Sequence, residues 1–198
     1  MIMETRAVYD VSNLEVRQLG GRPRIFGAFP YNALAVLADR GTVRKESIKP
    51  GAFDYTLDDE TQEVSLLFGH SFDKPLASRL GGSLVLKDTE DFLTFIATIP
   101  EGAERATHVT DALVMLGTGL IRGISPGFRV PPTSAVPSAE RLVPEPGSKD
   151  GVMIRMLSSL VLYELSLVTR PAYEASLAEL RVKPTAPQKS YVRRFLLP

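Results

Sequence analysis

The stretch that decides the fold is residues 160–169, LVLYELSLVT, which closely follows a second run of the same kind at residues 152–157, VMIRML. Apolar residues dominate both runs, as is typical of buried strands. The longer run places Glu164 in this apolar frame. A buried carboxylate without a partner is costly in free energy, so we expect a polar group to meet Glu164 in the folded chain.

The first half of the chain contains further strand-like runs separated by Gly, Pro and Asp. They predict strands at residues 24–29, 64–68, 83–86 and 92–99. Residues 84–95 have the pattern of a hairpin, with an acidic turn at residues 87–91. Antiparallel pairing of neighbours is the simplest arrangement, so the fold class is mainly β.

Helical spacing is clearest over residues 107–120, where apolar residues recur three and four apart. Thr107 or Thr110 could cap the start of this helix, and one of its faces should pack on the sheet. A short helix is predicted within residues 48–57, where Pro50 suits an early helical position. Residues 173–182 predict a last helix.

Two segments have the composition of irregular structure. Residues 131–150 contain five prolines and no aromatic residue, which predicts a surface loop without strand pairing. Residues 183–198 are basic and carry no acid, which predicts a flexible tail. The expected organisation is therefore one domain over residues 1–182, containing the loop, followed by the tail.

Composition excludes several function classes. The 198 residues carry 23 Lys and Arg against 23 Asp and Glu, so no net charge favours nucleic acid or an anionic membrane. With no cysteine and only two histidines, neither a thiol nucleophile nor a multi-histidine metal site is expected, and no cofactor is implied. No apolar run is long enough to span a membrane, so we expect a soluble chain that is not secreted.

Three polar residues stand in apolar, strand-like surroundings: His70, Ser125 and Glu164. A hydroxyl, an imidazole and a carboxylate can satisfy one another's hydrogen bonds, and the same set can activate a serine nucleophile. Simpler roles are open for each residue. Ser125 could be a turn residue, His70 a structural residue at a strand end, and Glu164 the partner of an arginine such as Arg155.

The segment Gly123–Gly127 matches the G-x-S-x-G elbow of α/β-hydrolases, but the surrounding sequence does not fit that fold. No helix is predicted after it, both histidines precede Ser125, and Pro126 lacks the N–H that would serve as an oxyanion donor. Any oxyanion donor must come from elsewhere, for which Arg170 is a candidate. His108 and Asp111, three residues apart, are a weaker catalytic candidate.

Four segments, taken together and in order, resemble the prohead serine proteases of tailed phages, which are similar in fold to the herpesvirus maturation proteases. The resemblance spans about residues 24–175. The segments read ESIKPGAF at residues 46–53, LLFGH at 66–70, GISPGF at 123–128 and LYELSLVTRPAY at 162–173.

The resemblance implies a role for each of the three polar residues. His70 matches the general base, Ser125 the nucleophile and Glu164 the third member of the triad, a position at which the herpesvirus proteases carry a second histidine. Gly69 stands where the phage family usually has Asn. The implied fold is a closed or strongly bent, mainly antiparallel β-barrel with flanking helices.

The implied activity is that of a serine endopeptidase in capsid maturation. Its substrates would be the scaffold segment of the major capsid protein and the protease itself, cut inside an assembling procapsid in the cytoplasm of the bacterial host. The portal, the procapsid shell and further copies of the chain would be its partners. Two alternatives remain: a non-catalytic capsid or scaffold component with the same fold, and a small-molecule esterase.

Overall fold

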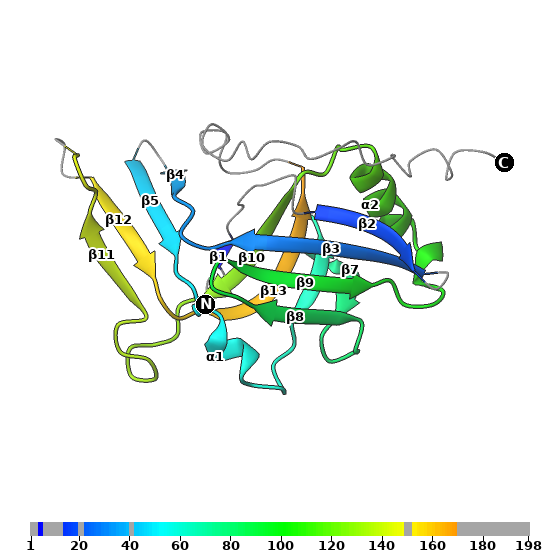
Figure 1. The fold of residues 1–198 in the computed structure, drawn as a ribbon, viewed down its shortest axis with the longest axis horizontal. Helices are drawn as coiled ribbons and strands as arrows, with labels where there is room; N and C mark the ends of the chain where they lie inside the picture. Colours follow the sequence, from blue (N-terminus) through cyan, green and yellow to red (C-terminus); the bar gives the residue numbers. More distant parts are fainter. Residues whose placement is uncertain (1–3, 6–13, 20–21, 40–41, 149–151, 170–198) are drawn as a thin grey trace.

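The computed structural model describes residues 4–5, 14–19, 22–39, 42–148 and 152–169, and their strands form three sheets (Figure 1). The strands are β1 (Glu4–Thr5), β2 (Leu14–Leu19), β3 (Arg22–Pro30), β4 (Ala35–Asp39), β5 (Thr42–Ile48), β6 (Ser65–Phe68), β7 (Ser71–Ser78), β8 (Leu84–Asp88), β9 (Phe92–Thr98), β10 (Gly123–Arg129), β11 (Glu140–Pro144), β12 (Met153–Leu157) and β13 (Val161–Val168). The helices are α1 (Asp54–Leu57), the 3₁₀ helix η2 (Ala103–Arg105) and α2 (Thr107–Gly117).

The first sheet, here called the central sheet, has five strands in the order β1-β10-β13-β6-β7. Adjacent strands within this sheet are antiparallel, except that β13 and β6 run parallel. The second, the cover sheet, has the fully antiparallel order β2-β3-β9-β8. The third, the wing, has the order β11-β12-β5-β4 and stands apart from the other two at the left of Figure 1.

The hydrophobic core includes buried residues of both the central sheet and the cover sheet. Leu165 and Leu167 of β13 belong to the same buried cluster as Phe95 of β9. At Gly27 the two sheets approach so closely that a Cβ atom would lie 2.4 Å from the Phe95 ring and 2.8 Å from Cδ1 of Ile124. Only glycine fits there, because a methyl group needs ordinary van der Waals spacing.

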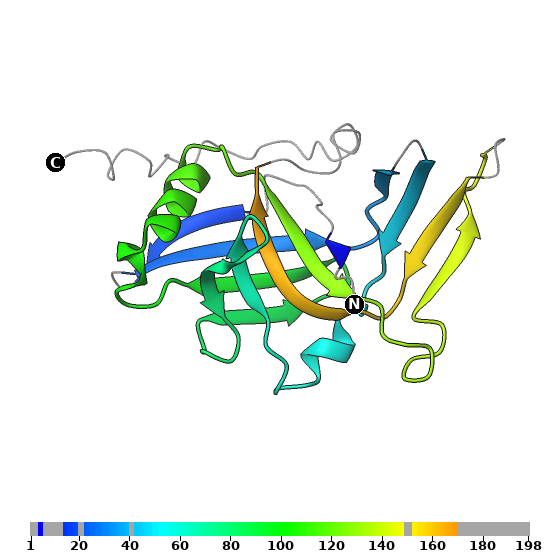
Figure 2. The same cartoon turned by 180° about the vertical axis from the view of Figure 1, so that it is seen from behind.

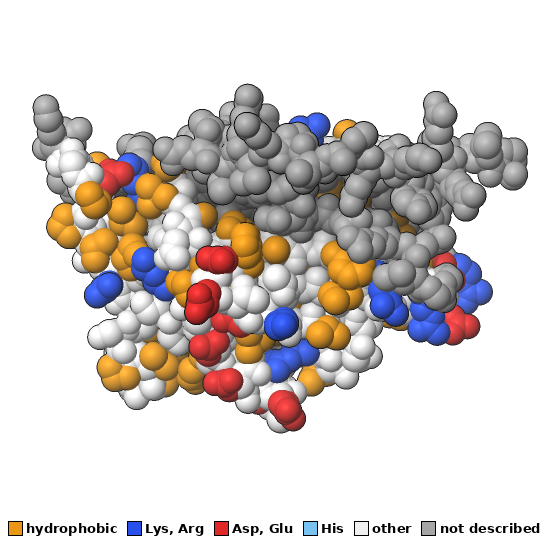
Figure 3. Space-filling model, viewed as in Figure 1, with side chains coloured by type: hydrophobic (Ala, Val, Ile, Leu, Met, Phe, Trp, Pro, Cys, Tyr) orange, Lys and Arg blue, Asp and Glu red, His pale blue; other side chains and the backbone are white. Residues whose placement is uncertain are grey.

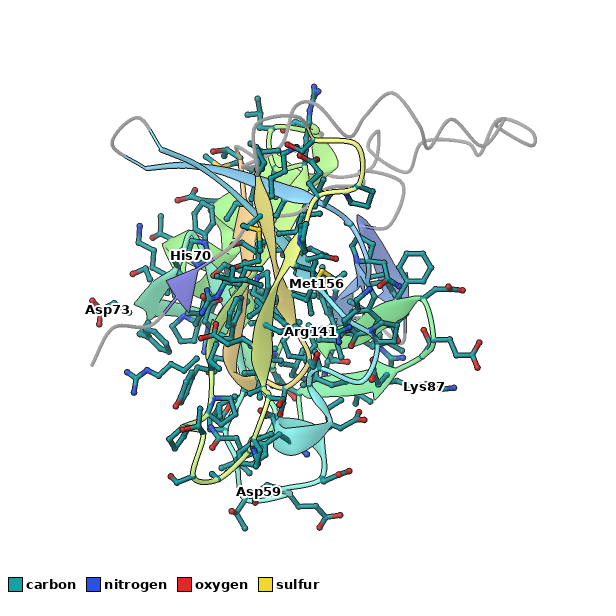
Figure 4. All side chains as sticks on the ribbon, turned by 90° about the vertical axis from the view of Figure 1, so that its left-hand side faces the viewer. Asp59, His70, Asp73, Lys87, Arg141 and Met156 are labelled. Carbon is teal, nitrogen blue, oxygen red and sulfur yellow. The ribbon has the colours of Figure 1, made fainter. Side chains whose placement is uncertain are left out.

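The arrangement of the two sheets is visible end-on in Figure 4. His70 and Asp73, at the β7 edge of the central sheet, lie on one side, and Lys87 of the cover sheet lies on the other. Arg141 and Met156, which are register partners in the wing, lie between them in this view. The expectation of a mainly β fold with a few helices is confirmed. None of the three sheets that the described residues form closes into a barrel, so the barrel is not confirmed.

All six predicted strands are present, as β3, β6, β8, β9, β12 and β13, and β8 and β9 form the predicted hairpin. The helix predicted over residues 107–120 is α2, which ends at Gly117, and Leu120 beyond it is 62% exposed. Neither Thr107 nor Thr110 caps α2: the N-cap is Ala106 and no side chain caps it. The Thr110 hydroxyl donates instead to the Glu104 carbonyl at 2.9 Å. The short helix predicted within residues 48–57 is the single turn α1.

The prediction that residues 131–150 hold no paired strand is wrong. This segment contains β11, which pairs along its whole length with β12. The five prolines do not prevent the pairing because four lie outside β11 and the fifth, Pro144, is its last residue. A strand at the edge of a sheet can also carry a proline without losing a bond to a second neighbour.

The wing carries exposed apolar side chains, which appear as the hydrophobic surface at the left of Figure 3. Leu142 of β11 is 66% exposed and Met153 of β12 is 39% exposed.

An ion pair crosses from β12 to β5, where the Arg155 guanidinium lies 3.1 Å from the Glu46 carboxylate. Arg155, the alternative partner considered for Glu164, is therefore engaged within the wing.

In the described part of the chain, no helix is both long and apolar enough to cross a membrane. The helix predicted over residues 173–182, the tail over residues 183–198 and Arg170 lie outside the described residues.

Candidate active site

The candidate site is built on one face of the central sheet, the face turned away from the core. Successive residues of a strand point to opposite faces, so Leu165 and Leu167 enter the core while Glu164 and Ser166 occupy the other face. The view from behind in Figure 2 shows β13 running beside β10. In this antiparallel pair Ser125 lies directly opposite Ser166, and Gly127 opposite Glu164. Ser125 therefore shares the face that carries Glu164.

His70 reaches this face from the tight turn between β6 and β7. Phe68 and Ser71 are register partners, so Gly69 and His70 form a two-residue hairpin turn. Both have positive φ, 68° at Gly69 and 60° at His70, as a type I′ turn requires. The Gly69 N–H donates to the Leu167 carbonyl at 3.0 Å, which fastens the turn to β13.

The same backbone geometry explains how Gly69 can stand where the resemblance described above leads to the expectation of Asn. Glycine adopts positive φ without steric cost, and asparagine is among the residues that tolerate it best. A Cβ added at Gly69 would meet nothing within 4 Å. The two residue types are therefore alternatives for one backbone conformation, and the turn does not depend on the missing amide.

The imidazole of His70 and the carboxylate of Glu164 are hydrogen bonded, with 2.7 Å between Nδ1 and Oε1. Glu164 is fully buried, whereas the His70 side chain is 28% exposed. An ionised carboxylate can only accept, so with Glu164 in that form the proton of the bond lies on Nδ1 of the histidine. In the neutral ring this leaves Nε2 with a lone pair that can accept a proton from a hydroxyl.

Ser125 lies in the buried middle of β10, with 1% of its surface exposed. Its place in the register puts it one strand from Glu164 and opposite the residue that binds the His70 backbone. The fold thus brings His70, Ser125 and Glu164 from separate parts of the sequence to one region of one face. A hydroxyl, an imidazole and a carboxylate are the three groups that nucleophilic acyl transfer by a serine uses.

Gly127 is part of this site for a reason that sequence analysis did not identify. A Cβ atom at this position would lie 2.2 Å from Oε1 of Glu164, the oxygen that binds His70. The missing side chain therefore provides the space in which the carboxylate lies across β10. The glycine was visible in the G-x-S-x-G match, but its function depends on the neighbouring strand, which the sequence does not specify.

Sequence analysis also did not assign Ser166 to the site. Its hydroxyl accepts the His70 N–H at 3.0 Å and donates to Oε2 of Glu164 at 2.6 Å. The alternation of β13 did carry a signal, because residues two apart in a strand share a face and Ser166 is two residues after Glu164.

The remaining candidates lie elsewhere. His108 on α2 is half-buried, and its Nε2 lies 2.9 Å from the Pro75 carbonyl. No group of three or more metal-ligating side chains that could hold an ion occurs among the described residues.

Comparison with known proteins adds one result. A family model described as Caudovirus prohead serine protease matches residues 28–190 of the chain. No curated protein and no solved structure matches it.

Proposed function

Because the chain belongs to the caudovirus prohead serine protease family, we propose that it is an endopeptidase with a Ser125-His70-Glu164 triad. Membership implies a serine peptidase of phage capsid maturation that acts on capsid proteins within procapsids. The observation that most supports the triad is the 2.7 Å bond from His70 to the buried Glu164, on the sheet face that Ser125 shares.

The proposed mechanism is acyl transfer at a peptide bond. The Ser125 hydroxyl attacks the carbonyl carbon and passes its proton to Nε2 of His70, while Glu164 stabilises the resulting imidazolium. The tetrahedral intermediate collapses, His70 returns the proton to the leaving amine, and an acyl-enzyme remains. His70 then activates a water molecule that releases the acid and restores Ser125. Arg170 is our candidate for stabilising the negative oxygen of the intermediate.

The proposed substrates are the scaffold segment of the major capsid protein and the chain itself. Cleavage would take place inside the assembling procapsid in the host cytoplasm, with the portal, the shell and further copies of the chain as partners. Residues 183–198 are the proposed site of self-cleavage or attachment to the shell, because they are basic and contain prolines. We also propose, from the resemblance, that the domain ends at residue 182 and that its fold is a bent or closed β-barrel.

The test is co-expression of the cognate capsid protein with the wild-type chain, Ser125→Ala or Ser65→Ala, followed by intact mass measurement of both proteins. Ser65 is a matched control because it lies on β6, directly beside Glu164 in the central sheet, and takes no part in the triad. We expect discrete products with the wild type and with Ser65→Ala, and none with Ser125→Ala. Identical cleavage by wild type and Ser125→Ala would contradict the proposal; uncut proteins throughout, in assembled shells, would favour a non-catalytic shell component.

A further inference from the structure

The hydroxyl of Ser166 is held in one orientation by its two partners. An N–H can only donate, so Oγ accepts from the His70 backbone at 3.0 Å, and its own hydrogen goes to Oε2 of Glu164 at 2.6 Å. Ser166 is fully buried, so loss of either hydrogen bond would leave a buried polar group without a replacement bond to water, which is costly in free energy. Its hydrogen is therefore committed to the carboxylate.

The backbone that Ser166 binds is conformationally unfavourable. His70 has φ of 60°, in the left-handed region that is unfavourable for a residue with a side chain. A residue keeps such a conformation only where its surroundings hold it. The bond from the His70 N–H to Ser166 is one contact that does so at the strained residue itself.

These bonds form a closed ring between the turn and β13. His70 is held at its backbone by Ser166 and at its imidazole by Glu164, and Ser166 in turn holds the other oxygen of the same carboxylate. A side chain whose backbone and ring are both fixed keeps one rotamer, and one direction for Nε2. Removing the Ser166 hydroxyl would leave the His70 N–H and Oε2 of Glu164 without these partners.

We propose that Ser166 is a positioning residue of the catalytic machinery, which sets the orientation of His70 relative to Ser125. This inference rests on the proposed triad, because it assigns to Ser166 an effect on the proton transfer that His70 performs. It differs from a purely structural role in one respect. It predicts a loss in the rate of the chemical step in a chain that is still folded and still binds its substrate.

The experiment uses the full chain and a quenched fluorescent peptide that spans the cleavage site identified by the mass measurement. We expect Ser166→Ala to lower kcat about 10- to 100-fold with KM within about twofold of the wild type. Ser65→Ala is the matched control and should retain both parameters. The melting temperature of each variant shows whether it is folded at the assay temperature.

A second pair of variants guards against loss of folding in Ser166→Ala. Threonine and valine have nearly the same shape, but only threonine keeps the hydroxyl. The difference in rate between Ser166→Thr and Ser166→Val therefore reports on the hydrogen bonds of this side chain. We expect Ser166→Thr to be at least about tenfold faster than Ser166→Val. In proton NMR the resonance of the His70 Nδ1–H should be present in the wild type and lost to solvent exchange in Ser166→Ala.

The possible results separate the two proposals. If the wild type cleaves and Ser166→Ala has an unchanged kcat, or if the Thr and Val variants are equally slow, the role of Ser166 is wrong and the triad stands. If Ser125→Ala cleaves and Ser166→Ala does not, Ser125 is not the nucleophile and both proposals are wrong. If the wild type leaves the capsid protein uncut in assembled shells, the proposed function fails and the role of Ser166 with it.

Discussion

Gly127 and Gly69 are both glycines of the candidate site, but for different physical reasons. At Gly127 the reason is space, because Oε1 of Glu164 occupies the place of a side chain. At Gly69 there is open space around the missing Cβ, and the reason is the positive φ of 68°. The two positions should therefore respond differently to substitution.

Gly127→Ala should inactivate the protease. The added methyl group would overlap Oε1 of Glu164, so either the carboxylate or β10 must move and the bond to His70 breaks. Displacements of about 1 Å at a catalytic group cost on the order of 100-fold in rate. Peptide cleavage measures the loss. Gly117→Ala is the control, since nothing lies within 4 Å of its missing Cβ, and equal activity of the two variants would contradict this role of Gly127.

Gly69→Asn should retain both fold and activity, because asparagine tolerates the backbone conformation of the turn. Gly69→Val should lower the free energy of unfolding by about 1–2 kcal/mol relative to the wild type, since a β-branched side chain is strained at positive φ. Urea denaturation compares the two. A stability of Gly69→Asn as low as that of Gly69→Val would show that backbone conformation is not the requirement at this position.

At the scale of elements, the single turn α1 is too short to be stable alone and is fastened to the central sheet by a buried threonine. The Thr56 hydroxyl accepts the Leu162 N–H at 2.7 Å and donates to the Leu160 carbonyl at 3.3 Å. Thr56 is 1% exposed, so these groups have no access to water in the folded chain. Thr56 is thus one of the buried contacts that join α1 to the start of β13.

Thr56→Val should lower the free energy of unfolding by about 1–3 kcal/mol, the cost of leaving a buried N–H without a partner. Thr94→Val is the matched control because the Thr94 hydroxyl donates to the Lys87 carbonyl at 2.8 Å in an exposed position, where water can replace it. Thermal or urea unfolding of the two variants provides the comparison. Equal losses in both would mean that burial of the Thr56 bonds contributes nothing.

The elements also show which local patterns can be interpreted without the fold. The hairpin of β8 and β9 was predictable because its turn and both strands are contiguous. The strand β11 was not, since a composition averaged over residues 131–150 hides five residues that pair with β12. Its prolines exclude an interior strand but not an edge strand, and only the sheet order reveals that β11 is at an edge.

At the scale of the whole molecule, a polar cluster joins the core, α1 and the cover sheet. The Tyr31 hydroxyl donates to the Asp88 carboxylate at the end of β8, and burial raises the pKa of Tyr31. Burial, followed by the hydrogen bond and the charge of Asp88, raises the pKa of Asp54 above its ordinary 3.8. Acidic side chains are prominent in this region, around α1, in Figure 3.

This shift makes one contribution to the pH dependence of the stability of the folded chain. A carboxyl group whose pKa is raised by folding stabilises the folded state while protonated, and the contribution is lost as pH rises through the raised value. Asp54→Asn should therefore be more stable than the wild type at neutral pH, and the difference should shrink as pH falls through the raised pKa and be gone below about 4. Melting temperatures measured across pH test the prediction.

Asp59→Asn is a control of opposite sign. Hydrogen bonds from Thr61 lower the pKa of Asp59, so its contribution is present above 3.8 and lost as pH falls through the lowered value. This variant should be less stable than the wild type at neutral pH, with a difference that disappears in acid. A stability gain for both variants at neutral pH would mean that net charge, rather than the local contacts, governs the effect.

The sequence by itself determined the β-rich class, helix α2, six of the thirteen strands in the described residues and the three polar residues in apolar surroundings. These features depend on periodicity and on the cost of burying a polar group, which act locally along the chain. Only the tertiary structure decided that β13 lies between β10 and β6. Because of that order, Glu164 binds His70 rather than Arg155, and the Glu164 carboxylate lies where a side chain at position 127 would be. The same order also brings the Ser166 hydroxyl within hydrogen-bond distance of the His70 backbone N–H. Contacts between strands far apart in sequence have no local pattern, because many pairings would satisfy the same alternation.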